Sequence, residues 1–349
     1  MKPFSQIEGQ EQARALLTAA VVSGRLAHAY ILAGPDGSGR LSAAIDLAKV
    51  HICRESKYGF CGECRHCSQI TGYSHPDVRF TVPSLKSSGP DELAELLRTR
   101  AEDGITPLRF PGNTYISIEQ IRELEARLSR KSFEGRGYVE IVTDAHLMRR
   151  EAANAMLKTL EEPPGGTLII LITSSLSGLL PTVRSRAHTI RFGRLTAESV
   201  EKVLLKRGVE SSAARKLSLC SDGCPGRALD MSRTELQEIP HTMELFKAAA
   251  SGLPPMEIAS LAGETARQLG RDGTLDLCNE LISLAHDARR SATGAEPLQR
   301  ESVPAISGLN DSMLETIITS MRLCRTRIKA NVSPAMALAA ALAAAAEKV

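Results

Sequence analysis

Two kinds of hydrophobic pattern alternate along the first 193 residues. Short apolar runs rich in β-branched residues, each bounded by turn or polar residues, indicate buried strands. These runs are Ala29–Ala33, Tyr138–Thr143, Leu168–Ser174 and His188–Phe192. Between them, apolar residues recur at helical spacing in Gly39–Ile52, Ile118–Arg130 and Arg149–Leu160. Because strands that alternate with helices form parallel sheets, the pattern predicts an α/β domain over residues 1–193.

The strand pattern stops after Phe192, and only helical periodicity follows. The predicted helices are Thr196–Arg207, Ser211–Ser221, Arg227–Ser232 and, after a nearly unbroken helical pattern, an Ala-rich closing helix at Ala335–Ala346. Pro and Gly residues at 223–226 and at 239–240 interrupt this pattern. We therefore expect a small helical domain at 194–236 and a larger one at 237–349. Residues 83–113 fit neither pattern and predict an inserted segment.

Composition narrows the range of functions. Of 349 residues, 43% are hydrophobic and 24% are charged, the net charge is +3, aromatic residues make up 3%, and tryptophan is absent. This content argues against a strongly basic or base-stacking nucleic-acid-binding module. The first residues lack the basic, apolar and small-residue succession of a secretory signal, and the sequence has no run of about 18 apolar residues. We therefore expect a cytoplasmic protein with no membrane partner.

Four of the eight cysteines lie close together, at Cys53, Cys61, Cys64 and Cys67. Four thiolates at this spacing are typical of a structural tetrahedral zinc site, which leaves no open position for catalysis. An iron–sulfur cluster is the alternative, although the Cys-Pro ending common in ferredoxins is absent. The sequence predicts a zinc knob at about 51–70, with His51 and His66 on the surface beside it.

A glycine loop that includes Gly34, Gly37 and Gly39 lies where a predicted strand turns into a helix. In that context the backbone N–H groups of such a loop bind phosphates. An active loop continues with Lys, which reaches the outer phosphates, and Ser or Thr, which holds Mg²⁺. This chain has Arg40 and Leu41 there instead. Leucine offers no oxygen to Mg²⁺, and a guanidinium is larger than an ammonium.

A second departure lies at the end of the predicted strand Tyr138–Thr143. An ATPase of this type carries Asp-Glu there, which organises Mg²⁺ and the attacking water. Here the pair is Thr143-Asp144. The two departures together predict a degenerate nucleotide site that does not hydrolyse ATP. We also expect no bound ATP, and weak nucleotide binding is left open.

These motifs together resemble the delta-prime and gamma/tau family of bacterial DNA polymerase III clamp-loader subunits. The resemblance rests on Phe4-x2-Ile7-x-Gly9-Gln10, His28-Ala29-Tyr30, the glycine loop, the four cysteines, Ala152–Pro164 (AANAMLKTLEEPP), Leu180–Arg186 (LPTVRSR) and Gly223–Ala228. It covers about residues 1–230, and the helical remainder corresponds in position and character only.

The resemblance implies an AAA+ P-loop-type α/β module with a zinc knob, an all-α lid and an all-α C-terminal collar that holds a hetero-pentameric ring together. It implies gamma/tau and delta subunits as ring partners. Through the complex, it also implies contact with the sliding clamp and primer-template DNA in replication.

In such rings, a Ser-Arg-Cys motif of one subunit directs an arginine at the ATP of the next. Ser185-Arg186-Ala187 matches that motif except at the cysteine, so the resemblance implies that Arg186 is an arginine finger in trans. Arg184 is the alternative finger, and a surface ion pair is the alternative role for Arg186.

Three further positions correspond to nucleotide-sensing residues of the family. Arg227 matches an arginine that reaches phosphates from the lid, and Thr173 and Ser174 match a polar sensor at a strand end. Because the loop is degenerate, Arg227 is then a remnant of such a nucleotide-sensing residue. An ordinary arginine at the N-terminus of a helix is at least as good an explanation.

The sequence therefore predicts a non-hydrolysing stator of the delta-prime type, which is not an enzyme by itself. The first alternative is an ATP-hydrolysing gamma-type subunit that tolerates Arg40. The second, a zinc-containing nucleic-acid-binding module, is disfavoured by the charge and the aromatic content.

Overall fold

The computed structural model describes residues 3–5, 7–56, 59–84, 114–233, 242–250, 254–292, 310–329 and 332–346. Its internal contacts divide the chain into two units, residues 1–233 and 234–349. Most of the predicted insertion at 83–113, namely 85–113, lies outside the described residues, as does the predicted interruption at 239–240.

In the described part of the first unit, parallel strands form one sheet in the order β2-β3-β4-β1-β5. The strands are β1 (Ala29–Ala33), β2 (Val78–Thr81), β3 (Tyr138–Val142), β4 (Thr167–Thr173) and β5 (His188–Arg191). Every residue of β1 and β4 is buried. Strands covered on both faces read as continuous apolar runs, which is why these two stood out in the sequence. The predicted parallel sheet is confirmed, and the ends of the four predicted strands differ from the observed ones by at most one residue.

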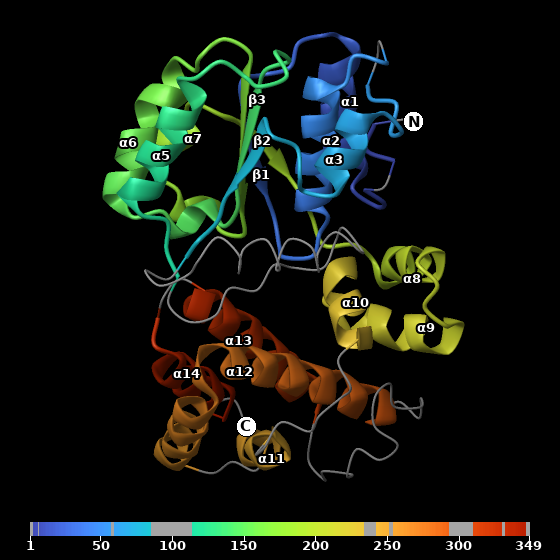
Figure 1. Cartoon of the computed structure of the whole chain (residues 1–349). Helices are drawn as coiled ribbons and strands as arrows, with labels where there is room; N and C mark the ends of the chain where they lie inside the picture. The colour runs from blue at the N-terminus through green and yellow to red at the C-terminus, as the bar shows by residue number, and fades with distance from the viewer. Residues whose placement is uncertain are drawn as a thin grey trace. The chain divides into compact units, whose positions relative to one another are not determined.

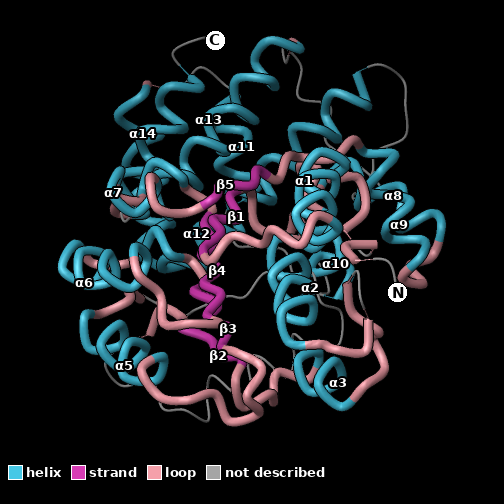
Figure 2. Tube along the Cα trace, turned by 90° about the horizontal axis from the view of Figure 1, so that it is seen from above, coloured by secondary structure: helices cyan, strands magenta, loops and turns pink. Residues whose placement is uncertain are grey.

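Helices cover both faces of this sheet (Figure 1). They are α1 (Glu11–Val22), α2 (Arg40–Ile52) and α3 (Arg65–Thr71) on one face, and α5 (Ile118–Leu128), α6 (Arg150–Glu161) and α7 (Pro181–Arg184) on the other. Figure 2 shows the same three layers from above. Because successive strand residues point to opposite faces, Leu32 packs into the core beneath α1 and α2, and Ile31 into the core beneath α5 and α6.

Local sequence explains where these helices begin and end. Ser117 and Gln120 form a capping box at the start of α5, each side chain bonded to the backbone of the other residue. The neighbouring helix α6 stops before Pro163 and Pro164, which cannot continue a helix. Among the described elements up to β5, the sequence analysis did not assign α1, α3, α7, β2 and two short 3₁₀ turns at Ala145–Leu147 and Leu176–Gly178.

The residues after the sheet form a small helical bundle. Its helices are α8 (Ala197–Lys206), α9 (Ser211–Cys220) and α10 (Pro225–Arg233), and they pack around their own core of Val200, Leu204, Ala214 and Leu229. The N–H of Leu195 donates to the carbonyl of Gly223 at 2.8 Å.

The elements in the described part of the second unit are helices. Its helices are α11 (Thr242–Ala250), α12 (Pro255–Ala292), α13 (Asp311–Lys329) and α14 (Pro334–Ala346), and α12 is kinked at Gly270, where φ is +67°. Leu281, Met321 and Leu338 bring α12, α13 and α14 into one buried core. None of the helices that the structure describes is long and apolar enough to cross a membrane.

Asp46 of α2 anchors the segment that precedes α1. Its Oδ2 accepts the backbone N–H of Phe4 at 3.0 Å, and Lys49 lies 3.8 Å from its other oxygen. Burial raises the pKa of Asp46 from 3.8 to about 6, and the nearby Lys49 offsets only part of this rise. The folded state therefore binds a proton at Asp46 more tightly than the unfolded chain does.

This pKa predicts a pH-dependent contribution to stability. As pH rises from about 4 to about 6, the carboxyl group must ionise in a buried place, so the free energy of unfolding should fall by about 2 kcal/mol from this group, out of a full difference of about 3 kcal/mol. Asp46→Asn should remove that dependence, since the amide oxygen still accepts the N–H of Phe4. Chemical denaturation of both proteins at several pH values between 4 and 7 measures the difference. If the two stability curves run parallel over this range, the raised pKa is wrong.

Candidate functional site

The glycine loop joins β1 to α2, as predicted. Gly39 precedes α2 with φ at +93°, a left-handed conformation that a residue with a side chain rarely adopts. The N–H of Gly34 donates to the carbonyl of Thr173 at 3.1 Å, which fixes the start of the loop to the end of β4. The loop thus has the position of a phosphate-binding turn at the carboxyl edge of the sheet.

The side chain of Arg40 is bound within the loop itself. Its Nη2 lies 2.6 Å from Oδ1 of Asp36, and only 6% of the Arg40 side chain is exposed. The next residue, Leu41, is buried in the core beneath the sheet. A carboxylate therefore holds the guanidinium that would otherwise face phosphate, and it adds negative charge to the loop.

The helical bundle packs directly against this loop. The N–H of Gly226 donates to the carbonyl of Gly37 at 2.9 Å. Gly37 has φ at +77°, and a Cβ atom there would lie 2.7 Å from the backbone nitrogen of Arg227. The guanidinium of Arg227 is buried, with Nη1 4.0 Å from Oδ2 of Asp222. The backbone of α10 thus contacts the loop, while the charge of Arg227 lies near a carboxylate of its own chain.

Polar residues at the ends of β3 and β4 lie at the same edge of the sheet. Thr143 is buried directly after β3, and Asp144 adopts a left-handed conformation with φ at +44°. The hydroxyl of Thr173 donates to the carbonyl of Ser175 at 2.9 Å and accepts the N–H of the same residue at 3.1 Å. Ser174 lies beside a histidine of the short 3₁₀ turn that follows β3. The hydroxyl of Thr173 therefore stabilises a local turn.

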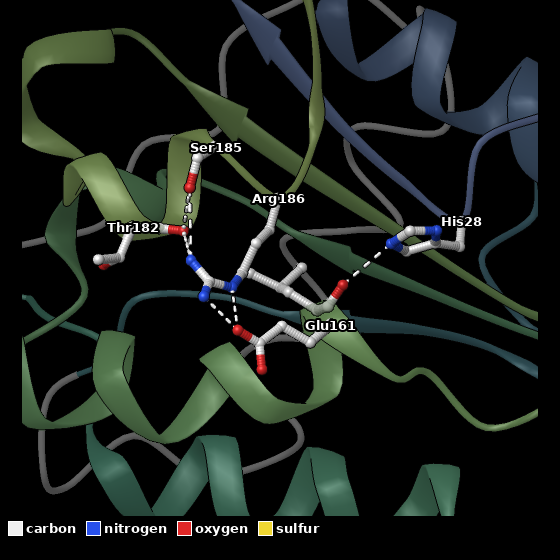
Figure 3. A network of polar contacts seen from close by, with 6 residues as sticks. His28, Glu161, Thr182, Ser185 and Arg186 are labelled. Atoms are coloured by element: carbon white, nitrogen blue, oxygen red, sulfur yellow. Dashed lines mark hydrogen bonds and ion pairs between the residues drawn. The ribbon is translucent and has the colours of Figure 1, made fainter.

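The guanidinium of Arg186 is held by residues of its own chain (Figure 3). Nε lies 2.6 Å from Oε1 of Glu161, and Nη2 contacts the same oxygen. Nη1 donates to the carbonyl of Thr182 at 2.8 Å and to Oγ of Ser185 at 3.3 Å. The side chain is still 31% exposed. Arg186 thus makes the ion pair that was the alternative to the finger, and it keeps an edge open to solvent.

Arg186 and the glycine loop lie at opposite edges of the sheet. In the parallel pair β1–β5, Tyr30 aligns with His188 and Ala33 with Arg191, which is about 10 Å of strand rise. Arg186 precedes β5 at the amino edge, whereas Gly34 follows β1 at the carboxyl edge. Arg186 therefore lies away from the glycine loop of its own chain.

The four predicted thiolates converge, and their sulfur atoms all lie within 4.8 Å of one another. Sγ of Cys53 lies 3.8 Å from that of Cys61 and 4.0 Å from that of Cys64, and Cys61 lies 3.9 Å from Cys67. Zinc–sulfur bonds of about 2.3 Å at tetrahedral angles place sulfur atoms about 3.8 Å apart, whereas a disulfide needs about 2.05 Å. The arrangement therefore fits one tetrahedral metal ion.

Three of these thiols have shifted pKa values, and burial raises the pKa of Cys64. The backbone N–H groups of Cys64 and then Glu63 point at the sulfur of Cys61 and lower its pKa to about 6. Burial raises the pKa of Cys67. Because the thiolate is the form that binds metal, a cation in the cluster would offset the unfavourable burial of a charged Cys67.

The two histidines beside the cluster are half-buried, which corrects the expectation that both lie on the surface. Nε2 of His51 donates to the carbonyl of Gly166 at 2.8 Å, and Nδ1 of His66 lies 3.0 Å from Nε2 of His75. Polar groups removed from water need such partners. The contact of His51 attaches the knob to the α/β core. The contact of His66 attaches the knob to the turn that follows α3.

The sequence analysis missed the carboxylates that pair with the predicted arginines, namely Asp36, Glu161 and Asp222. Asp36 lies four residues before Arg40 on the way into α2, a spacing that the sequence displays. Glu161 lies 25 residues before Arg186. It belongs to the AANAMLKTLEEPP motif, but nothing in the motif indicates its partner.

Comparisons with known proteins bear on the identity of the chain. A family model described as "DNA polymerase III, delta subunit" matches residues 9–196. The delta′ subunit of DNA polymerase III from Bacillus subtilis is 31% identical over 228 residues, which cover 65% of this chain and 60% of that protein. The delta′ subunit from Escherichia coli is 27% identical over 310 residues, which cover 86% of this chain and 83% of that protein. The gamma/tau subunit from Mycobacterium tuberculosis is 31% identical over 205 residues, with 58% and 31% covered.

The chain thus spans less than two thirds of the length of the Bacillus relative. Among solved structures, a DNA polymerase III gamma subunit-related protein from Thermotoga maritima has a TM-score of 0.38 at 19% identity, covering 96% of this chain and 99% of that one. The RuvB Holliday junction branch migration motor from the same organism has a TM-score of 0.41 at 14% identity, covering 85% and 86%. Because the family model matches more than half of the residues, the chain belongs to the DNA polymerase III delta subunit family.

Proposed function

We propose that this chain is a delta-prime-type subunit of a DNA polymerase III clamp loader, which does not hydrolyse ATP and donates Arg186 to the ATP site of a neighbouring subunit. Its delta′ relatives support the subunit type. The ion pair between Arg40 and Asp36 inside the glycine loop carries the first half of the proposal.

A nucleotide would have to displace that ion pair and would still lack its magnesium ligands. Asp36 repels phosphate at the place where an active loop attracts it. Leu41 and Thr143 stand where the hydroxyl and the carboxylate that organise Mg²⁺ belong. Binding energy and transition-state stabilisation are both lost, so the site is better suited to hold the helical bundle than to turn over ATP.

The position of Arg186 supports the second half of the proposal. Its place at the amino edge of the sheet separates it from its own loop and keeps part of the guanidinium exposed. A guanidinium brought to the phosphates of another chain stabilises the charge that develops on the transferred group.

The remaining parts of the proposal follow the family. Residues 194–236 would be the lid and 237–349 the collar through which gamma/tau and delta subunits join the ring. The clamp and primed DNA would be reached through the complex. Zn²⁺ bound by the four cysteines would be structural, since four thiolates leave no open position.

ATP turnover by the purified chain tests the proposal. With Mg²⁺ and ATP, the wild-type chain should show neither turnover nor saturable binding. The double variant Arg40→Lys, Leu41→Thr should gain Mg²⁺-ATP binding, because it restores the ammonium and the hydroxyl, but it should not turn ATP over without the Asp-Glu pair. Isothermal titration calorimetry and a phosphate-release assay measure the two steps.

Clear turnover by the wild-type chain that persists through purification would contradict the proposal. It would favour an ATP-hydrolysing gamma-type subunit, which the match to gamma/tau relatives also admits.

A further inference from the structure

The guanidinium of Arg186 is unusually well fixed for a partly exposed side chain. Arginine has five N–H groups, and four of them are directed at Glu161, Thr182 and Ser185. One Nη2 hydrogen is left without a partner among the described residues. We infer that Glu161 is a positioning residue, which sets the plane and reach of Arg186 toward the neighbouring nucleotide.

Glu161 extends from a rigid support. It is the last residue of α6, and the preceding carbonyl, that of Leu160, accepts the Nε2 hydrogen of His28 at 2.9 Å (Figure 3). One residue earlier, the hydroxyl of Thr159 donates to Oε1 of Glu125 on α5 at 2.9 Å. The end of α6 is therefore fixed both to the residue before β1 and to the adjacent helix, so the backbone that carries Glu161 has little freedom to move with Arg186.

The location of Glu161 is unfavourable for the helix alone. A carboxylate at a helix C-terminus meets the negative end of the helix dipole, whereas cations are favoured there. Arg186 compensates this charge through contacts of Nε and Nη2 with one oxygen. A residue that is unfavourable for its own helix, but whose charge one specific partner compensates, is expected at functional sites.

If the guanidinium is already fixed before the neighbouring subunit binds, less side-chain entropy is lost on binding. A freely rotating arginine loses side-chain entropy when it docks on phosphate, and a fixed one has already lost it. Nη1 is held on the backbone of α7, and Nε on Glu161 of α6, so two separate elements define the plane. The exposed edge of Nη2 is then the part presented to the phosphate of the neighbouring subunit.

This inference rests on the proposed function and is tested in the reconstituted clamp-loader complex with its partner subunits, sliding clamp, primed DNA and ATP. Glu161→Ala should lower kcat for stimulated ATP turnover about tenfold, as expected for a misplaced reacting group, with KM for ATP little changed. Glu161→Gln should restore most of the rate, because its amide oxygen still accepts both N–H groups. In an Arg186→Ala background, Glu161→Ala should have no further effect.

Glu162→Ala is the matched control. Glu162 follows Glu161 as the C-cap of the same helix and has the same charge, and its side chain makes no hydrogen bond or ion pair with any described residue, so turnover should stay at the wild-type rate. If Arg186→Ala is slow but Glu161→Ala equals the wild type, or exceeds it, the positioning role is wrong and the proposed function stands. A further loss in the Arg186→Ala background would also refute it. If Arg186→Ala itself turns over at the wild-type rate, the proposed function fails instead.

Discussion

Arg186→Ala should abolish most of the clamp- and DNA-stimulated ATP turnover at the site that receives this arginine, by about 10³–10⁵-fold. The loss follows from the charge that develops on the transferred phosphoryl group, which a guanidinium stabilises in a site with little water. Steady-state phosphate release by the reconstituted complex measures the effect. Assembly should be unchanged, because the exposed ion pair with Glu161 contributes little to the stability of the fold.

Arg184→Ala provides the control for this experiment. Arg184 ends α7 two residues before Arg186 and is exposed, and its side chain makes no hydrogen bond or ion pair within the described part of the chain. Its removal changes the net charge of the same surface without touching Glu161. If turnover falls for Arg184→Ala but not for Arg186→Ala, Arg184 is the arginine finger instead. Unchanged turnover in both variants would show that neither Arg184 nor Arg186 is an arginine finger.

The sheet could be predicted where burial on both faces produced an unbroken apolar run. β1 and β4 are of this kind, whereas β2 is a four-residue edge strand in which Arg79 is exposed and Phe80 only half-buried. Such a segment has too few apolar residues to stand out from a loop. α1 is a different case, because Ala13, Leu17 and Val21 recur every four residues and are the residues it buries. That helical signal was present in the sequence.

The candidate site was predictable where residues close in sequence are also close in space. Cys61, Cys64 and Cys67 are of this kind, and so is the Asp36–Arg40 pair. The partner of Arg186 was not predictable in this way. Glu161 meets Arg186 only because the end of α6 and the start of β5 lie at one edge of the sheet, and β4 intervenes along the chain. Pairings of this kind depend on strand order, which the hydrophobic pattern does not fix.

Removal of the metal should unfold the knob between Cys53 and Cys67. A structural zinc ion bound by four thiolates contributes about 10 kcal/mol to local folding, and little else holds this segment, since its buried cluster beyond the cysteines contains only Phe60 among the described residues. Protein purified without chelator should contain one zinc per chain by metal analysis. Cys67→Ser should lose that zinc and increase amide hydrogen exchange across the knob, because the buried Cys67 is one of the four cysteines proposed to bind it.

Cys224→Ala is the control, because Cys224 is a buried thiol outside the cluster and should leave the zinc content at the wild-type level. Iron with visible absorbance in place of zinc would identify an iron–sulfur cluster in the same four-thiolate site. Protein without zinc or iron, or a Cys67→Ser variant with its full zinc content, would contradict the assignment. Because His51 connects the start of the knob to the carbonyl of Gly166 just before β4, exchange should also rise there if unfolding of the knob is transmitted to the sheet.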